Sequence, residues 1–541
     1  MTVSHYVWLA RSRPIRRLLL GYCLCYAGDL AAFTAASVFV YHAGGAAYVG
    51  LLGLLKALPG AVLVPLVGSW SDRVRRERLL VVTVVLRALL LGTAAAVMTS
   101  GAQAILVLVL AGLEAGLTSV FRQVQAALLP WLARTPDELT NANTAIGVAQ
   151  SAATLGGPAV AAGLLAVDTP QAAMLAACGL TAIAAAILSG VRPLSSQQPT
   201  RTAGRLRQLR LDVAAGFKAG IGRKGVLPLV IPAAAQTFAR GVLSILTVTI
   251  ALNLFGLGPA GVGWLTAMLG AGGVLAGPVA AVLVRGKTVA RCFAAGVAGW
   301  GVQMILLSLA HAPYWPYLMF GFIGAANVFD DAGVYSALQQ VIPSELIGRA
   351  LGIRRAVLLL SMGLGSVVAP LLIDAWGDRG ALLTTGVLLV AVTAMSLPSL
   401  TAIDRRVWVS GPDLALLRQV SFFAPLPFAI AEHLASRLQS ATYEPGDVII
   451  QDGEPGERFY MIADGRARVC KDDKELRQMG PGESFGEIAL LRQVPRTATI
   501  LAIDRLEART LGREEFLAAV TGNAESAKGA DEVVSGRLQA G

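Results

Sequence analysis

The chain has 541 residues, of which 55% are hydrophobic and only 15% are charged, and its formal net charge is +11 at pH 7. Residues 1–400 contain 28 Lys and Arg against 13 Asp and Glu, whereas residues 401–541 contain 17 against 21. The first part is too apolar for a soluble domain, and the second has an ordinary globular composition. The positive excess belongs to the apolar part, so it does not indicate nucleic-acid binding. The five scattered cysteines and four histidines argue against a disulfide framework and a metal site.

Apolar runs of about 20 residues, long enough to cross a bilayer, recur through the first 400 positions. Lys and Arg occupy alternate loops between these runs, whereas the intervening loops contain none, apart from one arginine near 375–379. This alternation is typical of a membrane protein whose basic loops face the cytoplasm. The N-terminus shows no small-residue cleavage site, so we expect the first span to be retained. We predict twelve transmembrane helices in the inner (plasma) membrane, with both termini cytoplasmic, at 16–40, 46–69, 78–100, 103–131, 140–166, 171–191, 225–253, 259–284, 289–310, 314–342, 347–374 and 380–400.

The two halves of this apolar region resemble each other. Pro130 is followed 28 residues later by Pro158, and Pro343 is followed 27 residues later by Pro370. The first pair falls at spans four and five, and the second at spans ten and eleven. Parallel repeats of six spans, with a binding site at their interface, are the architecture of the major facilitator superfamily.

The loop between the second and third spans resembles the signature loop of that superfamily. It contains Gly68-Ser69-Trp70-Ser71-Asp72-Arg73-Val74-Arg75-Arg76. The resemblance implies that Gly68 lets two helices approach closely. It also implies that Asp72 caps a helix N-terminus across the interface of the halves, with Arg73 and Arg76 as basic positions. The sequence departs from the pattern at Arg75, where glycine is usual, and at Glu77, where a basic residue is usual.

Ionisable residues within the predicted spans are candidates for transport chemistry, because charges are costly in a bilayer and usually face a cavity or each other. Spans one, four, seven and ten line the cavity in the superfamily. We expect Asp29 or Glu114 to couple proton movement, since burial favours a neutral carboxyl group. Lys56 and Arg87 are better interpreted either as side chains that reach the membrane surface or as members of structural ion pairs. The further candidates for proton coupling or substrate binding are Arg122, Arg240, Asp330 and Asp331.

The composition becomes mixed after Arg406. We expect a helical segment at 414–439, followed by short strands at 447–451, 458–463, 466–471 and 497–502, with glycine-containing turns between them. These elements predict a small antiparallel barrel with a helix at each end. The segment from 192 to 224 is basic, with apolar residues at helical spacing, and is predicted to be an amphipathic helix on the inner membrane surface or a plain connector.

The run from Phe485 to Leu491, followed by Pro495 to Thr499, predicts a binding site for a phosphate joined to a sugar. Free N–H groups at the start of a short helix attract an anion, and Arg496 adds charge and a fork of donors. Glu487 would repel a phosphate unless it reaches a sugar hydroxyl. This run resembles the phosphate-binding cassette of the cyclic nucleotide-binding domains of kinase regulatory subunits, gated channels and bacterial regulators.

The resemblance to these domains covers residues 412–541 and implies specific roles. Arg496 would pair with the cyclic phosphate, and Glu487 would bind the ribose 2′-hydroxyl. The backbone amides of Gly486, Ile488 and Ala489 would complete the anion site, and the hydroxyl of Thr497 would add a contact. A threonine at this position occurs in relatives that bind either nucleotide. We expect cyclic AMP as the regulatory ligand, with cyclic GMP left open.

The predicted fold is an all-α membrane protein of twelve transmembrane helices in two halves, joined to a C-terminal β-barrel or jelly-roll domain with flanking helices. Its parts are a first half at 1–191, a basic loop at 192–224, a second half at 225–401, a linker at 402–411 and the nucleotide domain at 412–541. The Gly157-Pro158 element resembles the motif of proton-coupled exporters, which favours efflux.

The leading hypothesis is a secondary transporter of a small molecule that cyclic AMP regulates. The alternatives are a receptor without transport activity and a transporter whose tail serves only for oligomerisation. We expect no enzyme activity, and we expect a cyclic nucleotide, a small-molecule substrate and membrane lipid as partners, with a homo-oligomer left open. The 19 residues after Gly522 are too few for a helix-turn-helix, so DNA binding is not expected.

Overall fold

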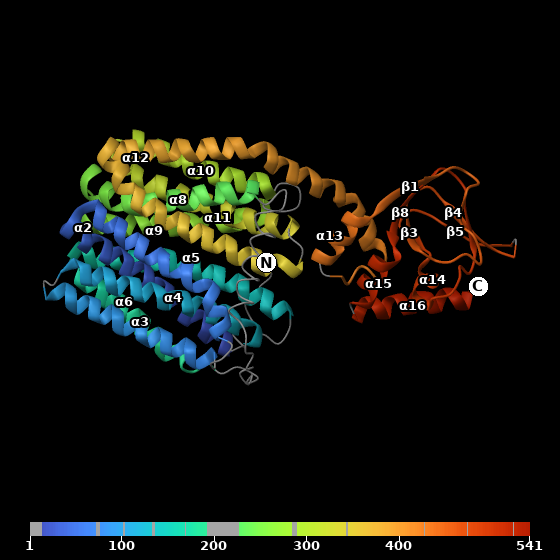
Figure 1. Cartoon of the computed structure of the whole chain (residues 1–541), viewed down its shortest axis with the longest axis horizontal. Coiled ribbons are helices and arrows are strands. Elements are labelled where there is room, and N and C mark those ends of the chain that lie inside the picture. The colour runs from blue at the N-terminus through green and yellow to red at the C-terminus, as the bar shows by residue number, and fades with distance from the viewer. Residues whose placement is uncertain are drawn as a thin grey trace. The chain divides into compact units, whose positions relative to one another are not determined.

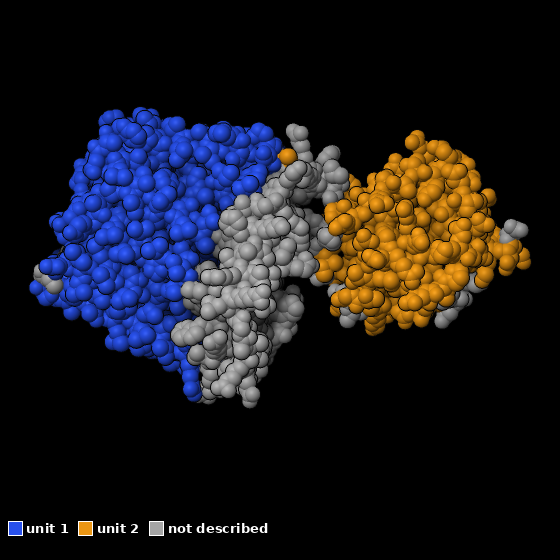
Figure 2. Space-filling model, viewed as in Figure 1, with its two compact units in different colours: residues 1–401 blue, residues 402–541 orange. Residues whose placement is uncertain are grey.

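The computed structural model describes residues 13–71, 76–100, 103–132, 136–167, 169–191, 227–283, 289–341, 344–426, 428–472, 474–522 and 524–540. The chain forms two compact units, residues 1–401 and residues 402–541, which Figure 2 colours separately. The loop predicted at 192–224, residues 72–75 of the signature loop and Pro343 of the proline repeat lie outside the described residues.

The first unit is built from helices (Figure 1). They are α2 (Arg13–Ser71), α3 (Arg76–Thr99), α4 (Ala104–Leu132), α5 (Pro136–Val167), α6 (Pro170–Leu188), α8 (Leu227–Thr249) with the π-helical turn η1 (Ile250–Leu254), α9 (Gly258–Leu283), α10 (Val289–Leu309), α11 (Trp315–Val341) and α12 (Ser344–Gln419). These segments are rich in alanine and leucine, which favour helix. A helix also satisfies its own backbone polar groups, which a bilayer core requires.

Two of these helices are interrupted by glycine. Gly45 in α2 has a φ of 62°, beside Gly44, whose ψ of 23° also leaves the helical region. Gly377 in α12 has a φ of 68°. Positive φ strains residues with a side chain, so the chain turns at glycine. α2 and α12 are therefore each two helical segments joined by a sharp turn.

Within the described residues, nine helical segments are long and apolar enough to cross a membrane. The helices follow the predicted apolar runs closely: 78–100 corresponds to α3, and 289–310 corresponds to α10. The run predicted at 314–342 is the helix α11, which is not among the nine. The N-terminal region is thus helix-rich and apolar.

Glycines bring helix backbones together in an equivalent way in the two predicted halves, residues 1–191 and 225–401. A β-carbon on Gly157 of α5 would collide with the carbonyl oxygen of Ala27 in α2. A β-carbon on Gly365 of α12 would collide with the carbonyl oxygen of Phe238 in α8. Small residues are what allow apolar helices to approach this closely.

Contacts between the halves repeat as well. A β-carbon on Gly263 of α9 would lie 2.7 Å from the carbonyl oxygen of Pro158 in α5. A β-carbon on Gly50 of α2 would lie 2.6 Å from the carbonyl oxygen of Ser366 in α12. Gly50 and Gly263 lie on the second predicted span of the first and second half, respectively. Each faces the fifth predicted span of the opposite half, which carries Ser366 or Pro158.

The second unit contains the end of α12, the helices α13 (Phe428–Arg437), α14 (Glu487–Arg492), α15 (Arg513–Thr521) and α16 (Ala524–Ala540), and two antiparallel sheets. The strands are β1 (Gln439–Tyr443), β2 (Val448–Ile450), β3 (Arg458–Asp464), β4 (Ala467–Lys471), β5 (Lys474–Met479), β6 (Ser484–Phe485), β7 (Thr499–Ala502) and β8 (Leu506–Gly512). The sheet orders are β1-β8-β3-β6 and β2-β7-β4-β5.

An aromatic cluster holds the helices against the first of these sheets. Phe422, Phe423, Phe459 and Phe516 are buried, with ring centroids 4.8–6.1 Å apart. Phe422 and Phe423 lie in the turn after α12, Phe459 lies on β3, and Phe516 lies on α15. Edge-to-face rings add to the free energy of their burial. The cluster therefore fixes the helices next to β3, which leads toward the candidate site.

Several predicted elements of this unit differ from the structure. The helix expected at 414–439 is interrupted by turns at 420–426, which include Pro425, and its last residue is the first of β1. The segment 402–411, predicted as a linker, is helical within α12. Strands β1, β5, β6 and β8 were not predicted. The strand expected at 497–502 begins only at Thr499, as β7, and the backbone of Arg496 before it pairs with the loop at 453–454.

Candidate functional site

A tight turn between β6 and α14 forms the centre of the candidate site. Gly486 has a φ of 90° and directly precedes α14. A β-carbon at this position would lie 2.7 Å from Nη1 of Arg496. Glycine is therefore required both by the backbone conformation and by the space that the arginine occupies. Ile488 and Ala489 follow in α14, where the first N–H groups of a helix have no partner within it.

The side chain of Arg496 is buried behind this turn, with 7% of the residue exposed. Its Nη1 donates to the carbonyl oxygen of Gly486 at 2.9 Å, and its Nη2 donates to the carbonyl oxygen of Arg458 at 2.7 Å. The guanidinium also lies 5.9 Å from the ring centroid of Tyr460. Burial lowers the pKa of Arg496 from its ordinary value, while Tyr460 and Glu487 act in the opposite direction. The result is a fixed, partly desolvated cation.

Glu487, the first residue of α14, is 1% exposed. Its Oε1 atom accepts a hydrogen bond from Nη1 of Arg537, on α16, at 2.5 Å. Its Oε2 atom is buried and has no hydrogen-bond partner among the described residues. Such a buried acceptor without a partner is costly. A hydroxyl group of a ligand would satisfy it.

The structure brings the predicted cassette residues together around one turn. Arg496 and Gly486 are in contact, and Glu487, Ile488 and Ala489 follow in sequence. Thr497 is half-buried next to Arg496. A second glycine, Gly456, packs here too, because a β-carbon on it would lie 2.6 Å from the β-carbon of Ala489. The arrangement joins a cation and helix N–H groups, which suit a phosphate, to a carboxylate oxygen, which suits a hydroxyl.

The family model described as "Cyclic nucleotide-binding domain" matches residues 441–523, which include the whole cassette. The chain carries a C-terminal cyclic nucleotide-binding domain. Strands β2 to β8 and the helices α14 and α15 lie within this match.

Curated relatives match about a fifth of the chain. A cAMP-dependent protein kinase regulatory subunit from Debaryomyces hansenii is 40% identical over 101 residues, which are 18% of this chain and 22% of that protein. A cGMP-dependent protein kinase from Plasmodium berghei is 34% identical over 109 residues, which are 20% of this chain and 13% of that protein. The chain thus spans less than a quarter of the length of these relatives.

Solved structures also match a fifth to a quarter of the chain. The regulatory domain of Toxoplasma gondii PKA with cAMP is 30% identical, with a TM-score of 0.20, and the match covers 20% of this chain and 44% of that one. A regulatory subunit of a cAMP-independent protein kinase A from Trypanosoma brucei is 25% identical, with a TM-score of 0.22, and the match covers 25% of this chain and 50% of that one.

The first unit contains a second group of candidate residues, a buried charge cluster. Arg87 on α3 pairs with Asp29 on α2 and, through Nε, with Oε1 of Glu114 on α4 at 2.9 Å. Nζ of Lys56 lies 3.5 Å from Oε2 of Glu114, and Arg122 lies 3.8 Å from Asp29. The predicted role of Lys56 and Arg87 in ion pairs agrees with this arrangement. The cluster ties α2, α3 and α4 together through the side chains of Asp29, Arg87 and Glu114.

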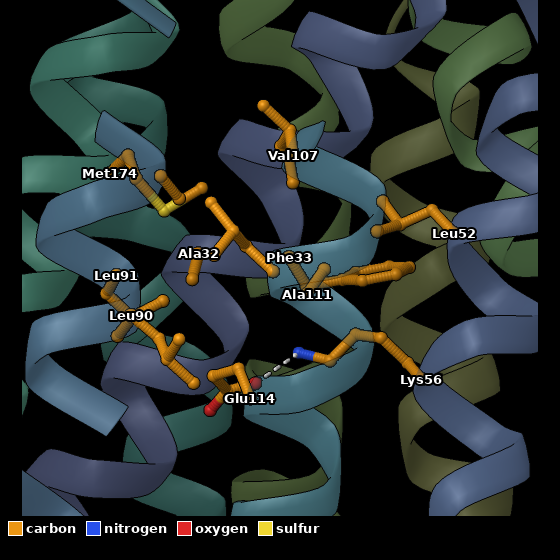
Figure 3. A pocket seen from close by; sticks show the side chains of 13 residues that line it. Ala32, Phe33, Leu52, Lys56, Leu90, Leu91, Val107, Ala111, Glu114 and Met174 are labelled. Atoms are coloured by element: carbon orange, nitrogen blue, oxygen red, sulfur yellow. Dashed lines mark ion pairs between the residues drawn. The ribbon is translucent and has the colours of Figure 1, made fainter. Parts of the chain in front are cut away.

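A small cavity of about 20 Å³ lies beside this cluster, which is room for about one water molecule. Figure 3 shows the ion pair between Lys56 and Glu114 at one end of its lining, with apolar side chains around the rest. Phe33 contributes a ring whose centroid lies 5.6 Å from Nζ of Lys56. The cavity is thus mostly apolar, with one charged pair.

The second half has a polar cluster of its own. Arg240 on α8 donates to Oδ1 of Asn327 on α11 and lies over the ring of Trp300 at 5.5 Å. Asn327 in turn donates to Oδ2 of Asp331 at 3.1 Å. Asp330 points elsewhere: it is 3% exposed, and its Oδ1 atom has no hydrogen-bond partner among the described residues. The adjacent aspartates therefore have different surroundings, as their positions on a helix predict.

The signature loop is only partly visible in the structure. Gly68 lies in α2 and Arg76 is the first residue of α3, while Asp72 and Arg73 lie outside the described residues. The expected cap formed by Asp72 therefore stays a prediction.

Sequence reasoning missed three residues that shape these sites. Arg537 was not predicted, because it lies 50 positions after its partner Glu487. Tyr460 lies beside Arg496 and stacks on Phe485 at 5.0 Å, and only its place in an expected strand was foreseen. Thr118 donates to Oε1 of Glu114 at 2.8 Å, and its spacing of four residues in the same helix is the signal that could have indicated it.

Proposed function

We propose that this chain is a secondary active transporter of a small molecule, with proton coupling and efflux as its direction, and that cyclic AMP regulates it. The observation that carries the proposal is the joining of an apolar helical unit, with a buried charge cluster, to a cyclic nucleotide-binding domain. Charges buried at membrane depth are typical of ion and substrate pathways. In this proposal the chain lies in the inner membrane, its nucleotide domain is cytoplasmic, and it catalyses no chemical step.

The helices support an architecture of twelve spans in two related halves. Counting the broken helices α2 and α12 as two segments each, and adding α11, brings the nine apolar segments to twelve. The glycine contacts repeat between the halves, with Gly157 against Ala27 in the first and Gly365 against Phe238 in the second. Such repetition is expected of parallel six-helix repeats, as in the major facilitator superfamily.

The charge cluster supports a physical route for proton coupling. Arg87 shares its charge between Asp29 and Glu114, which lie on two other helices. Protonation of either acid would release one of these ion pairs and loosen one helix contact. A change in helix packing of this kind is how small events at a site become a switch between states. Asp330 is the third candidate acid, and Arg122, Arg240 and Asp331 remain candidates for substrate binding.

The cassette supports cyclic AMP as the regulatory ligand. Arg496 supplies the cation for the cyclic phosphate, and Glu487 has a buried oxygen for the ribose hydroxyl. The relatives named as cAMP-dependent regulatory subunits match the domain at 33–40% identity. One relative is a cGMP-dependent kinase, so cyclic GMP is the competing ligand.

A ligand screen by thermal shift, with and without saturating cyclic AMP, tests the transport proposal and the regulation together. The purified chain and its Arg496→Ala variant are screened against the same small molecules. We expect a substrate whose stabilising effect depends on cyclic AMP in the parent and not in the variant, because linkage between two sites is reciprocal. The substrate is then tested in proteoliposomes under an imposed pH gradient, with Asp29→Asn and Glu114→Gln as coupling variants.

Three outcomes of these experiments contradict parts of the proposal. A molecule that binds but does not cross the bilayer indicates a receptor rather than a transporter. Transport that cyclic AMP leaves unchanged at saturation, in a chain that binds the nucleotide, indicates that the domain serves another purpose such as oligomerisation. If transport by both coupling variants follows the gradient as in the parent, the proton is carried elsewhere.

A further inference from the structure

The C-terminal helix α16 is tied to the cassette by two ion pairs. Nη1 of Arg537 lies 2.5 Å from Oε1 of Glu487, and Nη2 of Arg492 lies 2.8 Å from Oδ1 of Asp531. The two contacts differ in their surroundings. The side chains of Arg492 and Asp531 are 47% and 68% exposed, whereas those of Arg537 and Glu487 are 25% and 1% exposed. Exposed pairs contribute little to stability, and buried ones restrict geometry strongly.

The contact with Arg537 uses only one oxygen of Glu487. Oε1 is occupied, while Oε2 is buried without a hydrogen-bond partner among the described residues. A short, charge-assisted hydrogen bond to one oxygen restricts the rotation of the carboxylate. It therefore also fixes the direction in which Oε2 points.

The positive charge of Arg537 has a second effect, which is on the charge of Glu487. Glu487 is the acidic member of a cassette that has to accept a phosphate, and a carboxylate near a phosphate repels it. Arg537, bound to Oε1 of Glu487, balances the charge of this carboxylate and leaves Oε2 free for the ligand. Arg496 does not occupy Oε1 of Glu487, because its two terminal nitrogens donate to the backbone carbonyl groups of Gly486 and Arg458.

We propose that Arg537 is a positioning residue that holds Glu487 for the 2′-hydroxyl of a cyclic ribonucleotide, and so makes the domain select ribose over 2′-deoxyribose. The inference rests on the proposed nucleotide function and adds to it a residue outside the cassette. A ligand with the hydroxyl gains a hydrogen bond to a preorganised acceptor. A ligand without it leaves Oε2 buried and unpaired, which is the costly case.

Isothermal titration of the full chain in detergent with cyclic AMP and with 2′-deoxy cyclic AMP tests this role. The parent is expected to bind cyclic AMP about tenfold or more tightly than the deoxy analogue. Arg537→Gln is expected to reduce this affinity ratio towards one. Arg537→Lys keeps the positive charge but not the planar guanidinium donors, and its ratio is expected to lie between those of Arg537→Gln and the parent. In a Glu487→Gln background, Arg537→Gln is expected to change the ratio no further, because its effect passes through the carboxylate.

Two control variants separate the positioning role of Arg537 from a general effect of the docking of α16. Lys528→Gln removes a positive charge from the same helix at an exposed pair with Glu532, and it is expected to leave both affinities unchanged. Arg492→Gln weakens the other contact of α16 and is expected to change both affinities by the same factor. Thermal unfolding of each variant shows whether the domain is folded.

An unchanged ratio in folded Arg537→Gln would overturn the inference while leaving the proposed ligand intact. A ratio that falls equally in Arg492→Gln would also overturn it, since closure of α16 would then explain the selectivity. If the parent binds neither nucleotide, the proposed ligand itself is wrong, and the inference falls with it. If Arg537→Gln does not fold, the comparison of Arg537→Lys with the parent decides between these outcomes.

Discussion

Arg87 donates a hydrogen bond through Nε to Oε1 of Glu114 at 2.9 Å, although the two residues lie on different helices, 27 positions apart. The same guanidinium pairs with Asp29 on a third helix, and Arg87 is fully buried. A single side chain thus compensates two acids from α2 and α4. Every charge in this cluster depends on its partners, since an isolated charge is costly in an apolar interior.

Replacing Arg87 by leucine is expected to reduce the stability of the first unit by about 3–5 kcal/mol, because Asp29 and Glu114 lose their shared cation. Thermal unfolding of the full chain in detergent measures the effect. Arg122→Leu is the matched control, because Arg122 is half-exposed and lies 3.8 Å from Asp29. An equal loss in the two variants would show that Arg87 has no special place in the cluster.

Asp330 and Glu114 are expected to respond differently to neutralisation. Glu114→Gln removes the charge that pairs with Arg87 and Lys56, so its melting temperature should fall. Asp330→Asn removes a buried carboxyl that has no ion pair within the described structure, and its melting temperature should stay the same or rise. The same unfolding assay compares them. A larger fall for Asp330→Asn would mean that this acid holds the fold together.

Arg496→Ala is expected to weaken cyclic nucleotide binding by about 2–5 kcal/mol, because it removes the buried cation of the cassette. Isothermal titration with cyclic AMP measures the change. Arg458→Ala is the control: the side chain of Arg458 is exposed, and only its carbonyl oxygen, which the substitution keeps, contacts Arg496. Equal affinity of Arg496→Ala and the parent would contradict the assignment of the cassette.

Gly486→Ala is expected to lower both the stability of the domain and its affinity for the nucleotide. Its φ of 90° costs about 1–2 kcal/mol for a residue with a side chain. The new β-carbon would also meet Nη1 of Arg496 at 2.7 Å. Gly446→Ala carries a similar backbone cost at a φ of 93°, and no described atom lies within 4 Å of its β-carbon. Titration should therefore show a loss of affinity in the first variant alone.

Gly157→Ala is expected to destabilise the first unit, on the order of 1–3 kcal/mol, since its β-carbon would collide with the carbonyl oxygen of Ala27. The adjacent Gly156 has no described atom within 4 Å of its β-carbon, so Gly156→Ala should be neutral or stabilising. Thermal unfolding of the two variants gives the comparison. A neutral Gly157→Ala would show that the close packing of α2 and α5 can relax freely.

Much of the chain's architecture is already determined by local sequence. The apolar runs predict the helices of the first unit closely, because a helix forms its hydrogen bonds within one segment and only needs apolar side chains around it. The cassette is also local, as Gly486, Glu487 and Arg496 lie within one short stretch. The sequence of this stretch was therefore enough to predict both the short helix α14 and the proximity of Arg496 to Gly486.

The tertiary structure decided what depends on partners from distant segments. It paired β1 with β8 and so turned the end of an expected helix into a strand. It also decided that Arg87 serves Asp29 and Glu114 together, and that Arg537 reaches Glu487 from α16. Burial makes an unpaired charge costly and so requires a partner, but helical spacing alone does not show which of several arginines meets which acid. The sequence therefore determined the elements and the chemistry of the cassette, and only the packing of those elements determined the partners.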